Sequence, residues 1–158
     1  MKQQVFKYLK SYSTTPINVD RLIVSAFLQI NKVKFSNNTF IKSLIITDDN
    51  VEEYINLNNF ISVIKTEVSK FDLEALIEMF EFVISPSDRI INGAIYTPSD
   101  IREYIISQSF RKVGNQLLNA KIADISCGCS GFLYSAAKEI KTRTGSSYQS
   151  IFQNQIFG

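Results

Sequence analysis

The amino-acid sequence predicts a mainly α-helical N-terminal region, followed by the first β-α unit of an α/β fold whose sheet is incomplete. Two observations lead to this prediction. Apolar residues recur at helical spacing along most of residues 1–88, the pattern of amphipathic helices packed on a core. Residues 121–140 contain a short apolar run, a turn of small residues and a second helical pattern, in that order. We therefore expect two domains, 1–88 and 89–158.

The composition fits a folded protein and excludes several classes. The 158 residues are 45% hydrophobic and 20% charged, so a packed core is expected and disorder is not. No run of about 18 apolar residues occurs, so we expect no membrane as a partner. The net charge of +2 argues neither for nor against nucleic acid. The 2 cysteines are too close in sequence to pair well, and histidine is absent, so no zinc site and a reduced, cytoplasmic setting are expected.

The first region is expected to contain helices whose stripes form a core rather than a ligand site. Pro16 interrupts the first two, and Asn18 is the expected N-cap of the second. Residues 39–47 fit either a helix or a strand, residues 48–50 fit a cap or turn, and residues 85–88 form the expected boundary loop. The stripes are Val5, Tyr8, Leu9 and Tyr12; Leu22, Ile23, Ala26, Phe27 and Ile30; Leu57, Phe60, Ile61, Ile64 and Val68; and Leu73, Leu76, Ile77, Phe80, Val83 and Ile84.

The strand, turn and helix of residues 121–140 are the most informative stretch. Small residues let a ligand approach the backbone, and the free N–H groups of the new helix point toward it. The helix is expected to bury one face, made of Phe132, Leu133, Ala136, Ala137 and Ile140. The glycines do not match a dinucleotide fingerprint, and the P-loop lysine is absent. From the residues alone, the stretch is either a nucleotide or nucleoside site or a plain strand-to-helix turn.

Three segments between residues 91 and 158 match known motifs in one order. Residues 124–133, DISCGCSGFL, match the pattern D-P-[AS]-C-G-S-G-x-F-L, and residues 93–98, GAIYTP, match G-x-[FY]-Y-T-P. Residues 153–158 more weakly match the opening of a following strand. Together they resemble the adenine-specific, amino-group DNA methyltransferases of restriction-modification type. The matched part is less than half of the chain.

The resemblance implies a Rossmann-like S-adenosylmethionine-dependent methyltransferase fold with S-adenosylmethionine as its cofactor. It also implies double-stranded DNA as a partner of the full-length protein, and a specificity or nuclease subunit or domain, in a restriction-modification or phage-defence system. The cofactor-binding residues that it implies are Tyr96, Thr97, Asp124, Ser126, Cys127, Gly128, Gly131 and Phe132.

Several of these residues have two interpretations. Tyr96 and Thr97 are implied to contact the methionine part of the cofactor, and Thr97 also fits the N-cap of a helix that carries Ile101, Tyr104 and Ile105. The Asp124 carboxylate either receives the cofactor's amino group or orients the turn by accepting backbone N–H groups. Phe132 is either an apolar wall of the site or the first core residue of its helix. Gly128 lets the main chain approach the cofactor, and Cys127 is interpreted as a packing residue because no basic partner is evident.

Basic side chains are expected to be solvated rather than to bind DNA. Arg102, Arg111, Lys112 and Lys121 are scattered along the chain and fit a solvated helix face. Lys138, Lys141 and Arg143 lie near the end of the helix after the turn, where cations complement the helix dipole.

Two departures from the motifs matter. Ile125 stands where the family usually has Pro, and Ser130 stands where it usually has Gly. If position 130 requires a positive φ, a serine there costs on the order of 1 kcal/mol or more.

The family's catalytic [ND]-P-P-[YF] tetrapeptide does not occur, so no catalytic residue is predicted, and the chain alone is expected to be inactive. We therefore expect the N-terminal part of a methyltransferase. The alternative is a helical protein-interaction module with a vestigial cofactor turn. A third reading, methylation of RNA or protein, is disfavoured by the Tyr-Thr-Pro segment.

Overall fold

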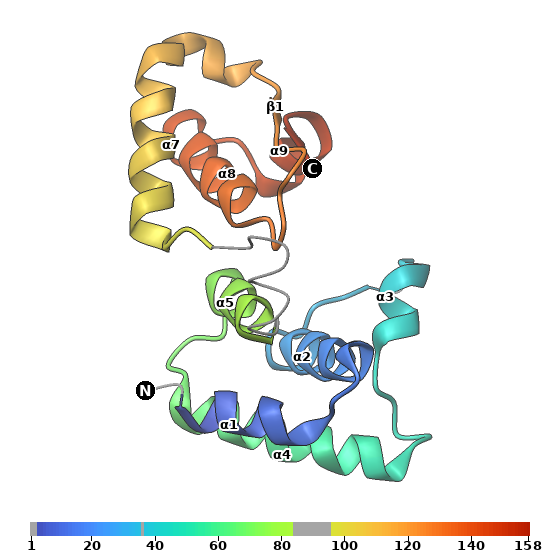
Figure 1. Cartoon of the computed structure of the whole chain (residues 1–158). Coiled ribbons are helices and arrows are strands. Elements are labelled where there is room, and N and C mark those ends of the chain that lie inside the picture. Colours follow the sequence, from blue (N-terminus) through green and yellow to red (C-terminus); the bar gives the residue numbers. More distant parts are fainter. Residues whose placement is uncertain (1–2, 36, 84–95) are drawn as a thin grey trace. The chain divides into compact units, whose positions relative to one another are not determined.

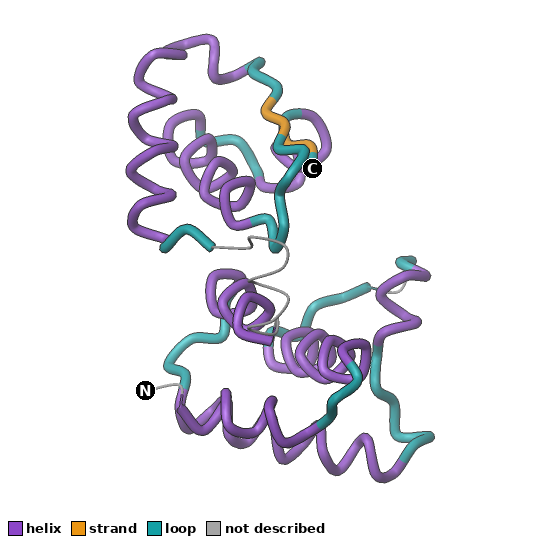
Figure 2. The backbone as a smooth tube through the Cα atoms, in the orientation of Figure 1, coloured by secondary structure: helices purple, strands orange, loops and turns teal. Residues whose placement is uncertain are grey.

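The computed structural model describes residues 3–35, 37–83 and 96–158, and the chain divides into two compact units, residues 1–93 and 94–158 (Figure 1). The described part of unit 1 is helical, and unit 2 combines helices with a two-stranded parallel sheet (Figure 2). The prediction of a helical region followed by a β-α start is thus confirmed at this level. The expected boundary loop, residues 85–88, lies outside the described residues.

Unit 1 is built from helices packed around one apolar core. The helices are α1 (Gln3–Tyr12), α2 (Pro16–Ile30), α3 (Thr39–Leu44), α4 (Val51–Glu67) and α5 (Leu73–Val83). Helix α2 packs against both α4 and α5, and α1 packs against the same two helices. Most of the predicted stripes face this core, whose most deeply buried members are Val5, Leu9, Leu22, Ile23, Ala26, Leu57, Phe60, Ile64 and Met79.

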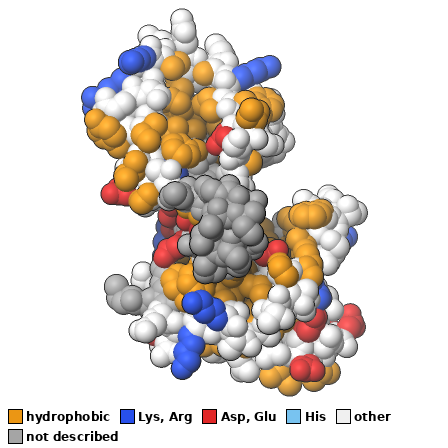
Figure 3. Space-filling model, viewed as in Figure 1, with side chains coloured by type: hydrophobic (Ala, Val, Ile, Leu, Met, Phe, Trp, Pro, Cys, Tyr) orange, Lys and Arg blue, Asp and Glu red, His pale blue; other side chains and the backbone are white. Residues whose placement is uncertain are grey.

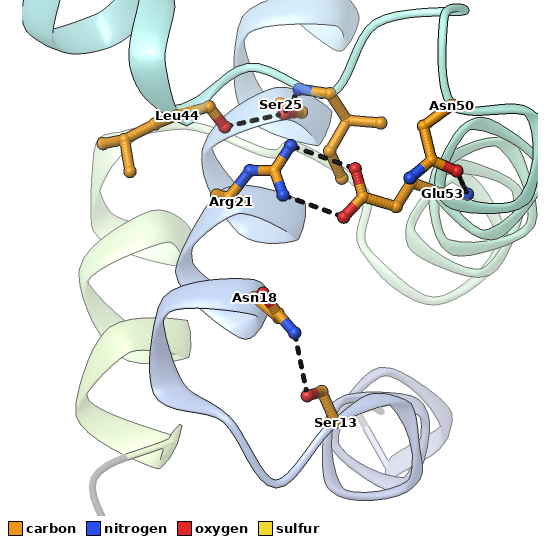
Figure 4. Close-up of polar contacts among 8 residues, drawn as sticks. Ser13, Asn18, Arg21, Ser25, Leu44, Asn50 and Glu53 are labelled. Carbon is orange, nitrogen blue, oxygen red and sulfur yellow. Dashed lines mark hydrogen bonds and ion pairs between the residues drawn. The ribbon is translucent and has the colours of Figure 1, made fainter.

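The start of α2 differs from the prediction. Asn18 is not the N-cap, because the helix begins at Pro16 and Thr15 occupies the extended cap position. A proline at the first helical position already has the required φ and needs no N–H partner, so it starts this helix instead of breaking it. Asn18 lies in the first turn, where its side-chain amide donates to Ser13 Oγ at 3.4 Å (Figure 4).

The ambiguous stretch 39–47 divides into two parts. Its first part is α3, whose N-cap Asn38 accepts a hydrogen bond from Ile41 N at 2.9 Å. The backbone becomes extended at Ile45, and the next residue, Ile46, is buried and donates its N–H to Ser25 Oγ at 2.8 Å. A serine inside α2 thus satisfies a buried backbone donor and fixes the segment after α3 on that helix.

Polar contacts also join α4 to its surroundings. The expected cap cluster at residues 48–50 is confirmed, since Asn50 Oδ1 accepts a hydrogen bond from Glu53 N at 3.2 Å. Arg21 of α2 donates two hydrogen bonds to the Glu53 carboxylate, at 2.8 and 3.0 Å (Figure 4). This bidentate ion pair holds α2 against α4.

The buried face of α5 differs in part from the predicted one. Leu73 was expected in the stripe but is exposed, whereas Ala75 and Met79 are buried. The other described members of the predicted stripe, Leu76, Ile77, Phe80 and Val83, are buried or half-buried. The Asp72 carboxylate accepts a hydrogen bond from Ala75 N at 3.2 Å at the start of the helix. Ile84, the last residue of the predicted stripe, lies outside the described residues.

Unit 2 contains a parallel β-α-β connection. Its elements are α7 (Ser99–Val113), the 3-10 helix η1 (Gly114–Leu118), β1 (Ile122–Ala123), α8 (Gly131–Thr144), α9 (Tyr148–Asn154) and β2 (Ile156–Phe157). In the sheet, Ile122 lies opposite Ile156 and Ala123 lies opposite Phe157. Parallel strands need a long crossover, which α8 and α9 supply here. The core of this unit consists of Phe110, Leu117, Leu133, Ala136, Ala137, Ile140, Ile151 and Ile156.

Helix α7 buries a different face from the one suggested by its apolar residues. Ile101, Tyr104 and Ile105 are exposed, at 47%, 66% and 42%. The face of α7 that packs on the rest of unit 2 comprises Arg102, Ile106, Phe110 and Val113. In the view of Figure 3, hydrophobic side chains gather on the visible face of unit 2. Across the described ranges, no helix has both the length and the apolar character that crossing a membrane requires.

Candidate functional site

The segment before α7 and the turn between β1 and α8 are in contact. A β-carbon placed on Gly128 would lie 3.6 Å from Cε1 of Tyr96, an ordinary van der Waals distance. The Cys129 thiol donates a weak hydrogen bond to the Tyr96 hydroxyl, with the sulfur 3.8 Å from the oxygen. Two stretches that are far apart in the sequence, and that match separate motifs, therefore meet at one place in unit 2.

Asp124 organises the turn through its side chain. Its backbone N–H donates to Phe157 O at 3.0 Å, which places it at the carboxyl end of β1 beside the end of β2. Its Oδ1 accepts a hydrogen bond from Ser126 N at 3.0 Å. Of the two roles considered for this carboxylate, the structure displays the one that orients the turn. The intervening Ile125 is fully exposed, so the family's proline at this position is not needed for packing.

The backbone of the turn adopts a positive φ twice. Gly128 has a φ of 51° and Ser130 has a φ of 62°, while Ser130 N donates to Cys127 O at 2.7 Å to close the turn. Position 130 thus has the conformation for which a glycine is preferred, and a serine there costs roughly 1 kcal/mol or more. Ser130 is also the N-cap of α8, yet its side chain makes no capping hydrogen bond.

Arg102 lies where the first turn of α7 meets the first residue of α8. It is only 3% exposed, which contradicts its assignment to a solvated helix face. Its Nη1 donates to Thr97 O at 2.8 Å. A β-carbon placed on Gly131 would lie 3.0 Å from Cζ and Nη1 and 3.1 Å from Nε, so the flat guanidinium covers Gly131. The sequence signal for this residue is its spacing from Ile106 and Phe110, which puts all three on one helix face.

Thr97 does not cap α7. The N-cap is Pro98, whose carbonyl accepts the first helical hydrogen bond from Arg102 N at 3.0 Å. With a ψ of 148°, Pro98 is still extended, so the helix begins one residue later than a Thr97 cap requires. The Thr97 carbonyl is instead held by the Arg102 side chain.

The remaining predicted residues differ in their surroundings. Cys127 is half-buried and packs against the core of unit 2, and a β-carbon on Gly158 would lie 3.1 Å from its sulfur. Phe132 is half-buried but does not belong to the core cluster, so it is not the first core residue of its helix. Ser126 is exposed.

Charged side chains on α8 are occupied by neighbours within unit 2. Lys138 pairs with Glu103 of α7, and Arg143 Nη2 lies 2.7 Å from the carboxylate of Glu139. Lys141 lies over the ring of Tyr148, 5.0 Å from its centroid. Each of these three cations thus has a partner side chain within unit 2. Among the described residues, no group of three or more His, Cys, Asp or Glu side chains is arranged to hold a metal ion.

Comparisons with protein-family models, with curated proteins and with solved structures find no match for this chain. The candidate site is therefore interpreted from its own geometry. It places the exposed main chain at Gly128, the Asp124 carboxylate and the ring of Tyr96 around one turn. The first residue of α8, Gly131, is covered by the Arg102 guanidinium. Carboxylate, main-chain and aromatic groups of this kind are ones that can contact a small polar ligand.

Proposed function

We propose that this chain is the cofactor-binding, N-terminal part of an S-adenosylmethionine-dependent DNA adenine methyltransferase of a restriction-modification or phage-defence system. One observation carries the proposal: Tyr96 lies against the turn at Gly128 and Cys129. These are the two stretches that resemble the family's cofactor motifs. A random coincidence of two short motifs would not require them to be in contact.

The proposed cofactor lies across the turn from Asp124 to Phe132. Gly128 leaves the main chain open to close approach, and Asp124 keeps the turn in shape through Ser126 N. Tyr96 and Thr97 contact the methionine part, and Phe132 contributes an apolar wall. Ser126, Cys127 and Gly131 complete the site as parts of the same turn.

A Rossmann-like methyltransferase fold belongs to the same proposal. The parallel pairing of β1 with β2 through α8 and α9 supports it, since this is the repeating unit of such folds. The candidate turn follows the carboxyl end of β1, where open α/β sheets bind their ligands.

Methyl transfer itself is assigned to the full-length protein. No [ND]-P-P-[YF] tetrapeptide occurs among these residues, so the group that would hold the flipped adenine is not in this chain. Double-stranded DNA, and a specificity or nuclease subunit or domain, are likewise proposed as partners of the full-length protein. The proposed location is the cytoplasm.

Isothermal titration with S-adenosylmethionine tests the proposal. We expect binding to the 158-residue chain, or to a longer product of the same gene, with 1:1 stoichiometry. Asp124→Ala should weaken binding about tenfold, because the turn loses the hydrogen bond that shapes it. Lys121 is exposed and directly precedes β1, at the opposite end of the strand from the turn. Lys121→Ala should therefore leave the affinity for S-adenosylmethionine unchanged.

The second candidate is a helical protein-interaction module. The exposed apolar stripe of Ile101, Tyr104 and Ile105 on α7 favours it, since such stripes are typical of surfaces that bind another protein. The titration separates the two candidates. No heat with S-adenosylmethionine, from either product, would favour the interaction module and remove the methyltransferase proposal.

A further inference from the structure

Among the residues that the structure describes, Arg102 is a buried charged side chain to which the proposed function gives no role. Its side chain lies between the two segments of the candidate site, although it belongs to neither motif. A buried guanidinium is costly unless its surroundings are matched to it, so its position calls for a physical reason.

Arg102 contacts both segments of the candidate site, and we call this pair of contacts, with Thr97 and with Gly131, the clamp. On one side, Nη1 holds the main-chain carbonyl of Thr97 at 2.8 Å. On the other side, the flat face of the guanidinium covers Gly131, where a β-carbon would lie within 3.0 Å of it. Gly131 is the first residue of α8, and Thr97 directly follows Tyr96. One side chain thus connects the start of α8 to the segment that carries the Tyr96 ring.

We propose that Arg102 is a positioning residue that keeps Tyr96 over the turn at Gly128 and Cys129. Gly131 takes part because a β-carbon there would make an unusually tight contact and would require the guanidinium to shift by a few tenths of an ångström. The placement of Tyr96 then sets the affinity of the site for its ligand. This last step rests on the proposed function, whereas the placement of Tyr96 does not.

The thiol of Cys129 reports on this placement directly. Cys129 is half-buried and its sulfur lies 3.8 Å from the Tyr96 hydroxyl, so displacement of Tyr96 would expose it further. In a Cys127→Ala background Cys129 is the single thiol of the chain, and its alkylation by iodoacetamide can be followed without ambiguity. We expect Arg102→Met to accelerate the alkylation about tenfold, since losing a hydrogen bond to a charged donor shifts a local equilibrium by roughly that factor. Arg102→Lys should give an intermediate rate, because it keeps the charge but loses the flat face.

Two control variants separate positioning from general destabilisation. Arg111→Met removes an exposed arginine from the same helix and should leave the rate unchanged. Ile140→Val removes a methyl group from the fully buried core of unit 2, away from the clamp. It should lower the melting temperature without accelerating the alkylation. If Arg102→Met does not fold, Gly131→Ala replaces it, because this variant keeps the arginine and displaces its guanidinium.

The outcomes are distinct. Equal Cys129 rates in Arg102→Met and Arg111→Met, or an equal acceleration by Ile140→Val, would overturn the positioning role. With both cysteines intact, a loss of S-adenosylmethionine affinity in Arg102→Met but not in Arg111→Met is expected. If Arg102→Met binds S-adenosylmethionine as tightly as the unaltered chain does, the placement of Tyr96 does not set the affinity of the site. Failure of the unaltered chain to bind S-adenosylmethionine counts against the proposed function only, since the alkylation rates still decide the role of Arg102.

Discussion

At the scale of single residues, Ser130 stands in a backbone conformation that suits glycine. Its φ is 62°, and its hydroxyl makes no capping bond that would compensate for the strain. We predict that Ser130→Gly raises the stability of unit 2 by about 0.5–1 kcal/mol, because the released strain exceeds the extra entropy of an unfolded glycine. Amide hydrogen exchange in α8 measures this change.

A second serine gives the matched control for that change. Ser147 caps α9 with a φ of −71°, and its Oγ accepts a hydrogen bond from Ser150 N at 3.2 Å. Ser147→Gly should therefore lower the free energy of unfolding of unit 2 by about 0.3 kcal/mol. Stabilisation by both substitutions, or by neither, would contradict the strain at Ser130.

Asp20 provides a pH-dependent prediction. Burial raises the pKa of its carboxyl above the ordinary value. Because the folded-state pKa exceeds the unfolded one, its contribution to stability is complete below about pH 3.9 and is lost as the pH rises through the folded pKa. Asp20→Asn should therefore be more stable than the unaltered chain at pH 7. The difference should shrink as the pH falls toward about 4, as measured by urea denaturation; a constant difference would contradict the raised pKa.

At the scale of elements, Gln155, the residue before β2, joins the chain there to the end of η1 and to Ala120. It is 6% exposed, and its side-chain amide donates to three backbone carbonyls: those of Leu117, Leu118 and Ala120, at 2.9, 3.1 and 3.2 Å. Gln155→Met keeps most of the side-chain volume but removes these donors. We predict a loss of about 1–3 kcal/mol in the stability of unit 2, measured by chemical denaturation. The exposed neighbour Gln153 supplies the control, since Gln153→Met should change stability by less than about 0.5 kcal/mol.

The accuracy of the sequence-based predictions also varied by element. The helices of unit 1 and the strand, turn and helix of unit 2 follow from local periodicity, and the structure contains them. The faces of α5 and α7 were harder to predict. Leu73 and Ile101 are apolar but exposed, because the faces of both helices are set by how they pack on residues distant in the sequence. Such contacts involve residues that the periodicity of a single helix does not reveal.

At the scale of the whole molecule, the two core clusters have no residue in common. One lies within residues 5–83, and the other lies within residues 106–156. We predict that residues 1–93 fold by themselves and melt cooperatively, as followed by far-UV circular dichroism. Residues 94–158 should melt at a lower temperature, because their smaller core supports only a two-stranded parallel sheet. Absence of a cooperative transition in residues 1–93 would show that their core depends on the second unit.

The sequence by itself determined the order of the elements, the small-residue turn after β1 and the motif residues around it. These features depend on spacing and residue type over short stretches, which any helix or turn displays locally. Only the tertiary structure decided that Tyr96 meets Gly128, that Ser130 adopts a positive φ and that Arg102 is buried against Gly131. Each of these depends on residues brought together by packing, and a close approach between distant segments is set by the shapes of the whole core rather than by local preference.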